Sequence, residues 1–180
     1  MVNKLIETID LTKVYGEKET SVTALNSINT SFKENQFTAI MGPSGSGKST
    51  LLHCLAGLDK VTGGSILING VDLASLNDKE LTKMRRDSFG FVFQAFNLIP
   101  TLTAEENITL PSSIAGKKPE EGWVKQVIEA MDIGDRLGHR PNELSGGQQQ
   151  RVAAARAMAS KPEVIFADEP SGNLDSKSSK

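Results

Sequence analysis

Apolar and polar positions alternate along the first part of the chain, where Ile28, Thr30 and Phe32 lie two residues apart. A period of two predicts strands with one face toward water, so we expect an antiparallel sheet within residues 3–36. Three later runs are short and almost wholly apolar: Phe37–Met41, Phe89–Phe93 and Val164–Ala167. Such runs are typical of strands buried in a parallel sheet.

Residues that end helices or form turns between these runs predict the remaining elements. Ser49–Ala56 should form a helix that Gly57 ends, and Asp78–Arg86 a short charged helix. Ser65–Asn69 should form a strand, and Asn69 followed by Gly70 is a strong signal for a tight turn.

The segment 95–160 has a different, helical character. In Trp123–Met131 the apolar residues return at intervals that place them on one helical face, and Gly147–Ser160 is rich in alanine. We therefore predict an α/β protein in which a core of residues 1–94 and 161–180 is interrupted by a helical subdomain at 95–160.

Composition narrows the class of protein. The chain has 180 residues, 38% of them hydrophobic, which suits one domain with a substantial core. The net charge of −2 gives no basic footprint for nucleic acid, and the single cysteine, Cys54, excludes an internal disulfide. No secretory leader and no apolar stretch long enough to span a bilayer is evident, so a function at a membrane would need another chain to supply the spans.

The strongest motif lies between the second apolar run and the first expected helix. The pattern G-x-x-x-x-G-K-S is complete, and a threonine follows it: Gly42, Pro43, Ser44, Gly45, Ser46, Gly47, Lys48, Ser49, Thr50. Glycines let backbone N–H groups approach phosphate oxygens, and the helix that follows presents its positive end to the same anion. The pattern assigns Lys48 to the β- and γ-phosphates of a nucleotide and Ser49 to Mg²⁺.

Two acids end the last apolar run. Asp168 and Glu169 follow Val164–Ala167, which would place both carboxylates at the ligand-binding edge of a parallel sheet. We predict that Asp168 holds Mg²⁺ and that Glu169 orients or deprotonates the attacking water.

A second glycine motif precedes an expected helix. It reads Leu144, Ser145, Gly146, Gly147, Gln148. Its simplest interpretation is a helix cap by Ser145. As a second anion-binding helix N-terminus it would be redundant in one chain, but two chains packed head to tail could complete each other's sites.

These motifs together resemble the ATP-binding cassette (ABC) family, over about Ile6 to Asp175. The resemblance implies a P-loop NTPase core of mostly parallel sheet with an N-terminal antiparallel β-subdomain. It also implies that Tyr15 stacks on adenine, although a half-buried strand tyrosine is a serious alternative. Gln94 matches the glutamine that contacts Mg²⁺ or water, and Asp175 the residue that reaches across the dimer.

Within the family, the stretch from Asn97 to Asn107 followed by Pro111 resembles the MacB, LolD and FtsE group. This implies a cytoplasmic ATPase on the inner face of the membrane that powers export of peptides, macrolides or lipoproteins through a permease. An FtsE-like regulator that acts without transport is the alternative. Residues Ser171–Asp175 resemble the family's D-loop. Family members continue past this loop with a switch histidine that neither His53 nor His139 matches, so we expect a C-terminally shortened chain that loses turnover more than nucleotide binding.

Two further hypotheses stay open. ATPases of DNA repair and chromosome organisation share the same motifs, but they place a long coiled coil or separate domains between the two nucleotide motifs, whereas here the segment is short and lacks sustained heptads. The chain could also be a nucleotide-binding fragment that does no work.

Overall fold

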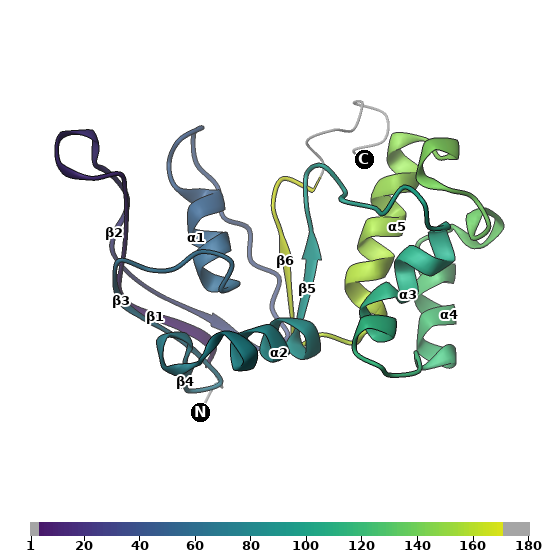
Figure 1. Cartoon of the computed structure of the whole chain (residues 1–180), viewed down its shortest axis with the longest axis horizontal. Helices are drawn as coiled ribbons and strands as arrows, with labels where there is room; N and C mark the ends of the chain where they lie inside the picture. The colour runs from purple at the N-terminus through teal and green to yellow at the C-terminus, as the bar shows by residue number, and fades with distance from the viewer. Residues whose placement is uncertain (1–3, 171–180) are drawn as a thin grey trace. The chain divides into compact units, whose positions relative to one another are not determined.

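The computed structural model describes residues 4–170, and the chain divides into two compact units between Lys83 and Met84 (Figure 1). The first unit is built on a four-stranded antiparallel sheet in the order β2-β1-β3-β4. Its strands are β1 (Lys4–Tyr15), β2 (Val22–Lys33), β3 (Gly63–Ile68) and β4 (Val71–Asp72). The antiparallel sheet expected from the period-two pattern is therefore confirmed.

Helix α1 (Lys48–Leu55) contacts β2 in this unit, and the helices η1 (Lys18–Thr20) and η2 (Leu73–Ser75) are single 3-10 turns. Asn69 and Gly70 join β3 to β4 with φ of 49° and 80°. Two successive left-handed residues are what a tight hairpin turn requires, so the predicted turn is confirmed. Helix α2 (Asp78–Ser88) covers the expected charged helix and crosses the division between the units.

The second unit pairs two parallel strands with a helical layer. Strand β5 (Phe89–Val92) pairs with β6 (Val164–Ala167), and α5 (Gly146–Ala159) contacts β5. Figure 1 shows α5 between β5 and the helices α3 (Ala104–Ile114) and α4 (Glu121–Ala130). The short helices η3 (Gly134–Arg136) and η4 (Pro141–Glu143) lie between α4 and α5. A buried apolar cluster that includes Ile108, Ile133 and Val152 joins these helices, and the helical character predicted for this part of the chain is confirmed.

The expectation of a buried strand at Phe37–Met41 is wrong for this structure. These residues have no regular secondary structure, and Phe37 and Met41 are 97% and 87% exposed. A run of apolar residues favours burial, but it forms a strand only where a neighbouring strand supplies hydrogen bonds. Within residues 4–170 no strand pairs with this run.

Strand β6 forms as expected but is not buried throughout. Only Phe166 is buried, whereas Ile165 is 44% exposed. Phe166 packs edge-on against Phe89 with ring centroids 5.2 Å apart, so one face of the parallel pair is closed by aromatic contacts. The sheet pairs β6 with β5 alone among the described residues, so the second edge of β6 has no strand partner there.

No helix within residues 4–170 is long and apolar enough to cross a membrane.

Candidate functional site

The loop that precedes α1 turns sharply at two glycines. Gly47 caps the helix with φ of 85°, and a Cβ built there would lie 2.5 Å from the carbonyl oxygen of Ala24. Only glycine fits this close approach. Gly45 also has a positive φ, 78°, and Ser46 N–H donates to the Pro43 oxygen at 3.3 Å to close the turn. The loop residues 41–46 are exposed to solvent, and the N-terminus of α1 follows directly after them. A helix N-terminus in such a position favours anions.

Lys48 lies over this loop. Its Nζ donates to the carbonyl oxygens of Gly42 and Pro43 at 3.0 and 2.8 Å. The ammonium group is thus held within the loop, where an anion bound by the backbone N–H groups would meet it. Ser49 and Thr50 follow in the first turn of α1 and are half-buried. The Lys48 ammonium and the backbone N–H groups of the glycine-rich loop are suitable donors to a phosphate chain. The hydroxyl groups of Ser49 and Thr50 are suitable ligands for the Mg²⁺ that accompanies it.

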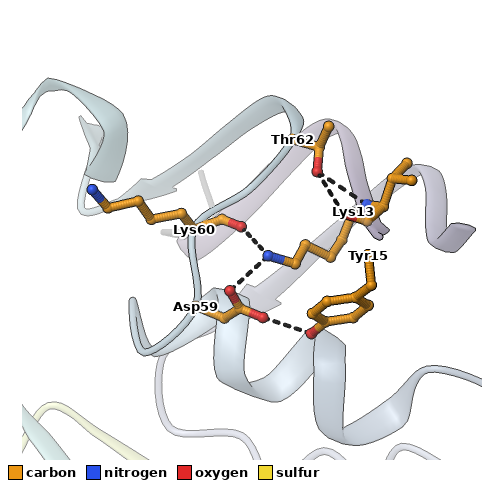
Figure 2. A network of polar contacts seen from close by, with 6 residues as sticks. Lys13, Tyr15, Asp59, Lys60 and Thr62 are labelled. Carbon is orange, nitrogen blue, oxygen red and sulfur yellow. Dashed lines mark hydrogen bonds and ion pairs between the residues drawn. The ribbon is translucent and has the colours of Figure 1, made fainter. Parts of the chain in front are cut away.

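Tyr15 ends β1 and is part of a polar network in the same unit (Figure 2). Its hydroxyl donates to Asp59 Oδ2 at 2.5 Å. Lys13 Nζ donates to Asp59 Oδ1 at 2.6 Å and to the Lys60 carbonyl at 2.7 Å, and it lies over the Tyr15 ring, 4.6 Å from the centroid. The Thr62 hydroxyl, also drawn in Figure 2, accepts from Val14 N–H at 3.0 Å.

The hydrogen bonds of this network shift the pKa values of its three titratable groups. Lys13 and then Tyr15, by hydrogen bonding, lower the pKa of Asp59. The hydrogen bond to Asp59 raises the pKa of Tyr15, and a side-chain hydrogen bond with Thr50 acts in the opposite direction. The same carboxylate raises the pKa of Lys13. At neutral pH the network therefore consists of a carboxylate, an ammonium and a protonated phenol.

In the second unit, Gln94 and Asp168 follow neighbouring strands. Val92 and Ala167 are register partners at the ends of β5 and β6, and Asp168 N–H donates to the Val92 oxygen at 3.0 Å. Because parallel strands end at the same sheet edge, these two side chains leave the sheet on that edge. Glu169 comes next, exposed and with φ of 44°, a left-handed conformation that a non-glycine residue rarely adopts.

The segment after Gln94 is tied to α5. Arg156 donates to the carbonyl oxygens of Phe96 and Asn97, and burial lowers the pKa of its guanidinium. Asn107 of α3 is fully buried and holds the next stretch, since its side chain accepts from Ile99 N–H at 2.8 Å and donates back to the Ile99 oxygen at 3.2 Å. The turn downstream of Gln94 is therefore fixed from two helices.

The second glycine motif begins α5 with a reciprocal cap. Ser145 Oγ accepts from Gln148 N–H at 3.3 Å, and the Gln148 side chain accepts from Ser145 N–H at 2.8 Å. Leu144 is buried in the helical core, while Ser145 and Gly146 are exposed. The cap interpretation is thus realised in the structure, and it leaves the first-turn N–H groups of the two glycines at an exposed helix N-terminus.

The predicted Mg²⁺ ligands are Ser49 in the first unit and Gln94 and Asp168 in the second. Their meeting around one ion stays a prediction, as does the role of each site residue. Within residues 4–170 no three His, Cys, Asp or Glu side chains gather as a metal site. The predicted set differs from that kind of site, because it combines a hydroxyl, an amide and one carboxylate. Asp175 lies outside the described residues.

Comparison with known proteins decides the family. Residues 25–172 match the family described as ABC transporter. The chain belongs to the ABC transporter family.

Several relatives are similar along nearly the whole chain. An ABC transporter ATP-binding protein of Thermotoga maritima is 49% identical over 98% of this chain and 76% of its own length. The macrolide export ATP-binding/permease protein MacB of Marinobacter nauticus is 49% identical over 97% of the chain, which spans only 28% of that longer protein. The lipoprotein-releasing system ATP-binding protein LolD of Geobacter metallireducens is 46% identical over 99% of the chain and 80% of its own.

Solved structures agree with this assignment. The dimeric structure of the ABC transporter cassette MJ0796 matches with a TM-score of 0.84 and 48% identity over 97% of this chain and 78% of its own. The post-hydrolysis structure of the same cassette with ADP and Pi matches with a TM-score of 0.83 and 47% identity, over 96% and 77% of the two chains. The cassette described above therefore has the predicted α/β fold and is an ABC-type ATPase.

Sequence patterns missed the residues that support the cassette's motifs. Asp59 reaches Tyr15, and Arg156 reaches the segment after Gln94, in each case from a distant position in the chain. Lys13 is close to Tyr15 in sequence, but Asp59 and the Lys60 carbonyl hold its ammonium group from a distance. No local pattern marks them, because a turn aspartate and a helical arginine are ordinary surface residues. Only an unusual pairing in three dimensions distinguishes them.

Proposed function

We propose that this cassette binds Mg-ATP on Gly42–Thr50 and completes the site with Ser145–Gln148 of a second copy packed head to tail. The observation that carries the proposal is the start of α1, where the left-handed turn at Gly47 and the inward Lys48 ammonium form a phosphate cradle. The exposed N-terminus of α5 supports the second half, since one chain needs only one cradle for one triphosphate.

In this proposal the residues divide the chemistry of hydrolysis. Lys48 and the glycine-rich backbone hold the phosphate oxygens and offset the negative charge that spreads over them in the transition state. Ser49, Gln94 and Asp168 would hold Mg²⁺, which neutralises charge on the β- and γ-phosphates. Glu169 accepts a proton from water as the water oxygen bonds to the γ-phosphorus and the bond to the ADP oxygen breaks.

The proposed setting is the inner face of the cell membrane, with a separate permease as partner. Support comes from relatives named for macrolide export and lipoprotein release. The bound and hydrolysed states would differ in closure of the dimer, and the helical subdomain around α3 and α4 would pass that change to the permease. The cargo would be read by the permease and not by this chain.

A regulatory ATPase of the FtsE kind remains the alternative, and purification with the permease separates the two. Stimulation of ATP turnover by the permease together with vectorial movement of a macrolide, peptide or lipoprotein in vesicles supports export. Stimulation without movement of any of these supports regulation. A chromosome-type ATPase is disfavoured, because the described helices between the two motifs are short, with α2 and α3 of 11 residues each.

Head-to-tail assembly predicts a specific complementation. Lys48→Ala removes one half of each composite site, and Gly147→Asp places a carboxylate against the phosphates in the other half. Each variant alone should lack turnover, whereas an equal mixture should regain roughly a quarter of wild-type turnover, because half of the dimers contain one intact site. A mixture as inactive as its parts, with ATP binding intact in wild type, would contradict the composite site.

The unmixed chain supplies the baseline. Turnover should rise with protein concentration and vanish in Glu169→Gln and in Lys48→Ala, whereas ATP binding should be lost only in Lys48→Ala. ATP binding that survives Lys48→Ala would refute the phosphate cradle itself.

A further inference from the structure

The ring of Tyr15 is held by side chains that have no part in the phosphate site. Its hydroxyl donates to Asp59, which follows α1 in sequence. Asp59 is in turn attached to that helix, because Leu58 and Asp59 N–H both donate to the His53 oxygen, at 2.9 and 3.3 Å. The ring at the end of β1 is thus connected to the helix that begins at the phosphate loop (Figure 2).

Lys13 adds a second restraint. The side chain is only 11% exposed, and its ammonium is held by Asp59 and by the Lys60 carbonyl. From this position it lies over the Tyr15 ring, whose residue remains 41% exposed. The cation occupies one ring face, so a flat ligand can stack only on the other.

We propose that Asp59 is a positioning residue for nucleotide affinity, which, with Lys13, fixes the Tyr15 ring at a set place relative to the phosphate loop so that an adenine base stacks on the free face. The proposal rests on the proposed function. Its physical basis is preorganisation: a ring already held in its binding orientation loses little rotamer freedom when the base arrives. A ring without these partners would have to be ordered by the ligand.

The contributions of the base and of the phosphates to binding can be measured separately. ATP carries both, whereas inorganic tripolyphosphate carries the phosphates alone. We expect Asp59→Asn and Tyr15→Phe each to weaken ATP binding by about three- to tenfold, the net range of one ordinary hydrogen bond. Tyr15→Ala, which removes the ring, should weaken it further. Calorimetry should find tripolyphosphate binding unchanged in all three variants.

Tyr15→Phe is the decisive variant because it keeps the ring and leaves the Lys13–Asp59 ion pair in place. Combined with Asp59→Asn it should cost less than the sum of the two single changes, since Phe removes the Tyr15–Asp59 hydrogen bond and Asn, which keeps an acceptor oxygen but loses the charge, weakens the same bond. Steady-state turnover should show a raised KM for ATP with kcat unchanged, because the γ-phosphate is untouched. Lys60→Ala is the matched control: it truncates an exposed neighbour whose backbone carbonyl still serves Lys13, and it should bind ATP as wild type does.

The outcomes are distinguishable. Loss of ATP binding only in Tyr15→Ala, with Asp59→Asn and Tyr15→Phe like wild type, would overturn the positioning role while leaving a stacking ring. Equal weakening of ATP and tripolyphosphate would overturn it too, because it would assign Asp59 to the structure of α1. Failure of the proposed function would appear separately, as ATP binding that does not depend on Lys48.

Discussion

Arg156 in α5 donates to the carbonyl oxygen of Asn97 at 2.6 Å, and its second nitrogen donates to the Phe96 oxygen at 2.7 Å. Both acceptor residues adopt left-handed backbone, with φ of 57° at Phe96 and 50° at Asn97. Such conformations cost free energy and persist where the surroundings hold them. The helix α5, which begins within the second glycine motif, thus supports a strained turn just downstream of Gln94.

Replacing Arg156 by alanine should lower the free energy of unfolding by about 2 to 3 kcal/mol, because two hydrogen bonds to a charged donor are lost and the turn keeps its strain. Urea denaturation measures the change, and hydrogen exchange at residues 96–99 should accelerate. Arg151→Ala is the control on the same helix. Its ion pair with Asp132 spans 3.7 Å to a side chain that is 95% exposed, so it should cost less than about 0.5 kcal/mol. Equal effects at the two arginines would contradict this account.

Asp87 makes stability depend on acid pH. Hydrogen bonds from Arg86 and then from Lys117 lower the pKa of its carboxyl to about 2. Because the folded pKa lies below the unfolded value of 3.8, the stabilisation is complete above about pH 4 and is lost as the pH falls toward 2. Exposure of the partners limits it to about 1 kcal/mol.

Asp87→Asn should therefore be less stable than wild type at pH 6, and the difference should disappear by about pH 2. Chemical denaturation at a series of pH values measures it. Asp132→Asn, at a carboxylate that is 95% exposed, serves as the reference for a general charge effect. A wild-type advantage that stays constant from neutral to strongly acidic pH would show that the hydrogen bonds to Asp87 contribute nothing specific.

Gly47 and Gly116 allow backbone strain and steric clash to be separated. Both have positive φ, 85° and 65°, but a Cβ at Gly47 meets the Ala24 oxygen at 2.5 Å whereas one at Gly116 meets nothing within 4 Å. Gly116→Ala should cost about 1 kcal/mol from strain alone. Gly47→Ala should cost more and also abolish ATP binding, because the start of α1 must shift. Thermal melts and calorimetry measure both. Indistinguishable melting temperatures would refute the close approach at Ala24.

The sequence predicted the local parts of this cassette well. The Asn69–Gly70 turn and the helix after Gly47 follow from backbone preferences that act within a few residues, and the structure confirms them. The family was recognisable for the same reason: its motifs are contiguous, and each has a physical meaning at fixed spacing. The cap by Ser145, which the sequence offered as the alternative to phosphate binding, is also local, and the structure contains it.

Pairing over long distances was beyond the sequence. Phe37–Met41 has the composition of a buried strand, yet it is exposed here, since composition does not supply a hydrogen-bonding neighbour. Tyr15 could be assigned to a strand end, but its bond to Asp59 joins residues 44 positions apart. Which charged side chain meets which ring or carbonyl depends on how the elements pack, because such contacts form only after the chain has closed the loops between them.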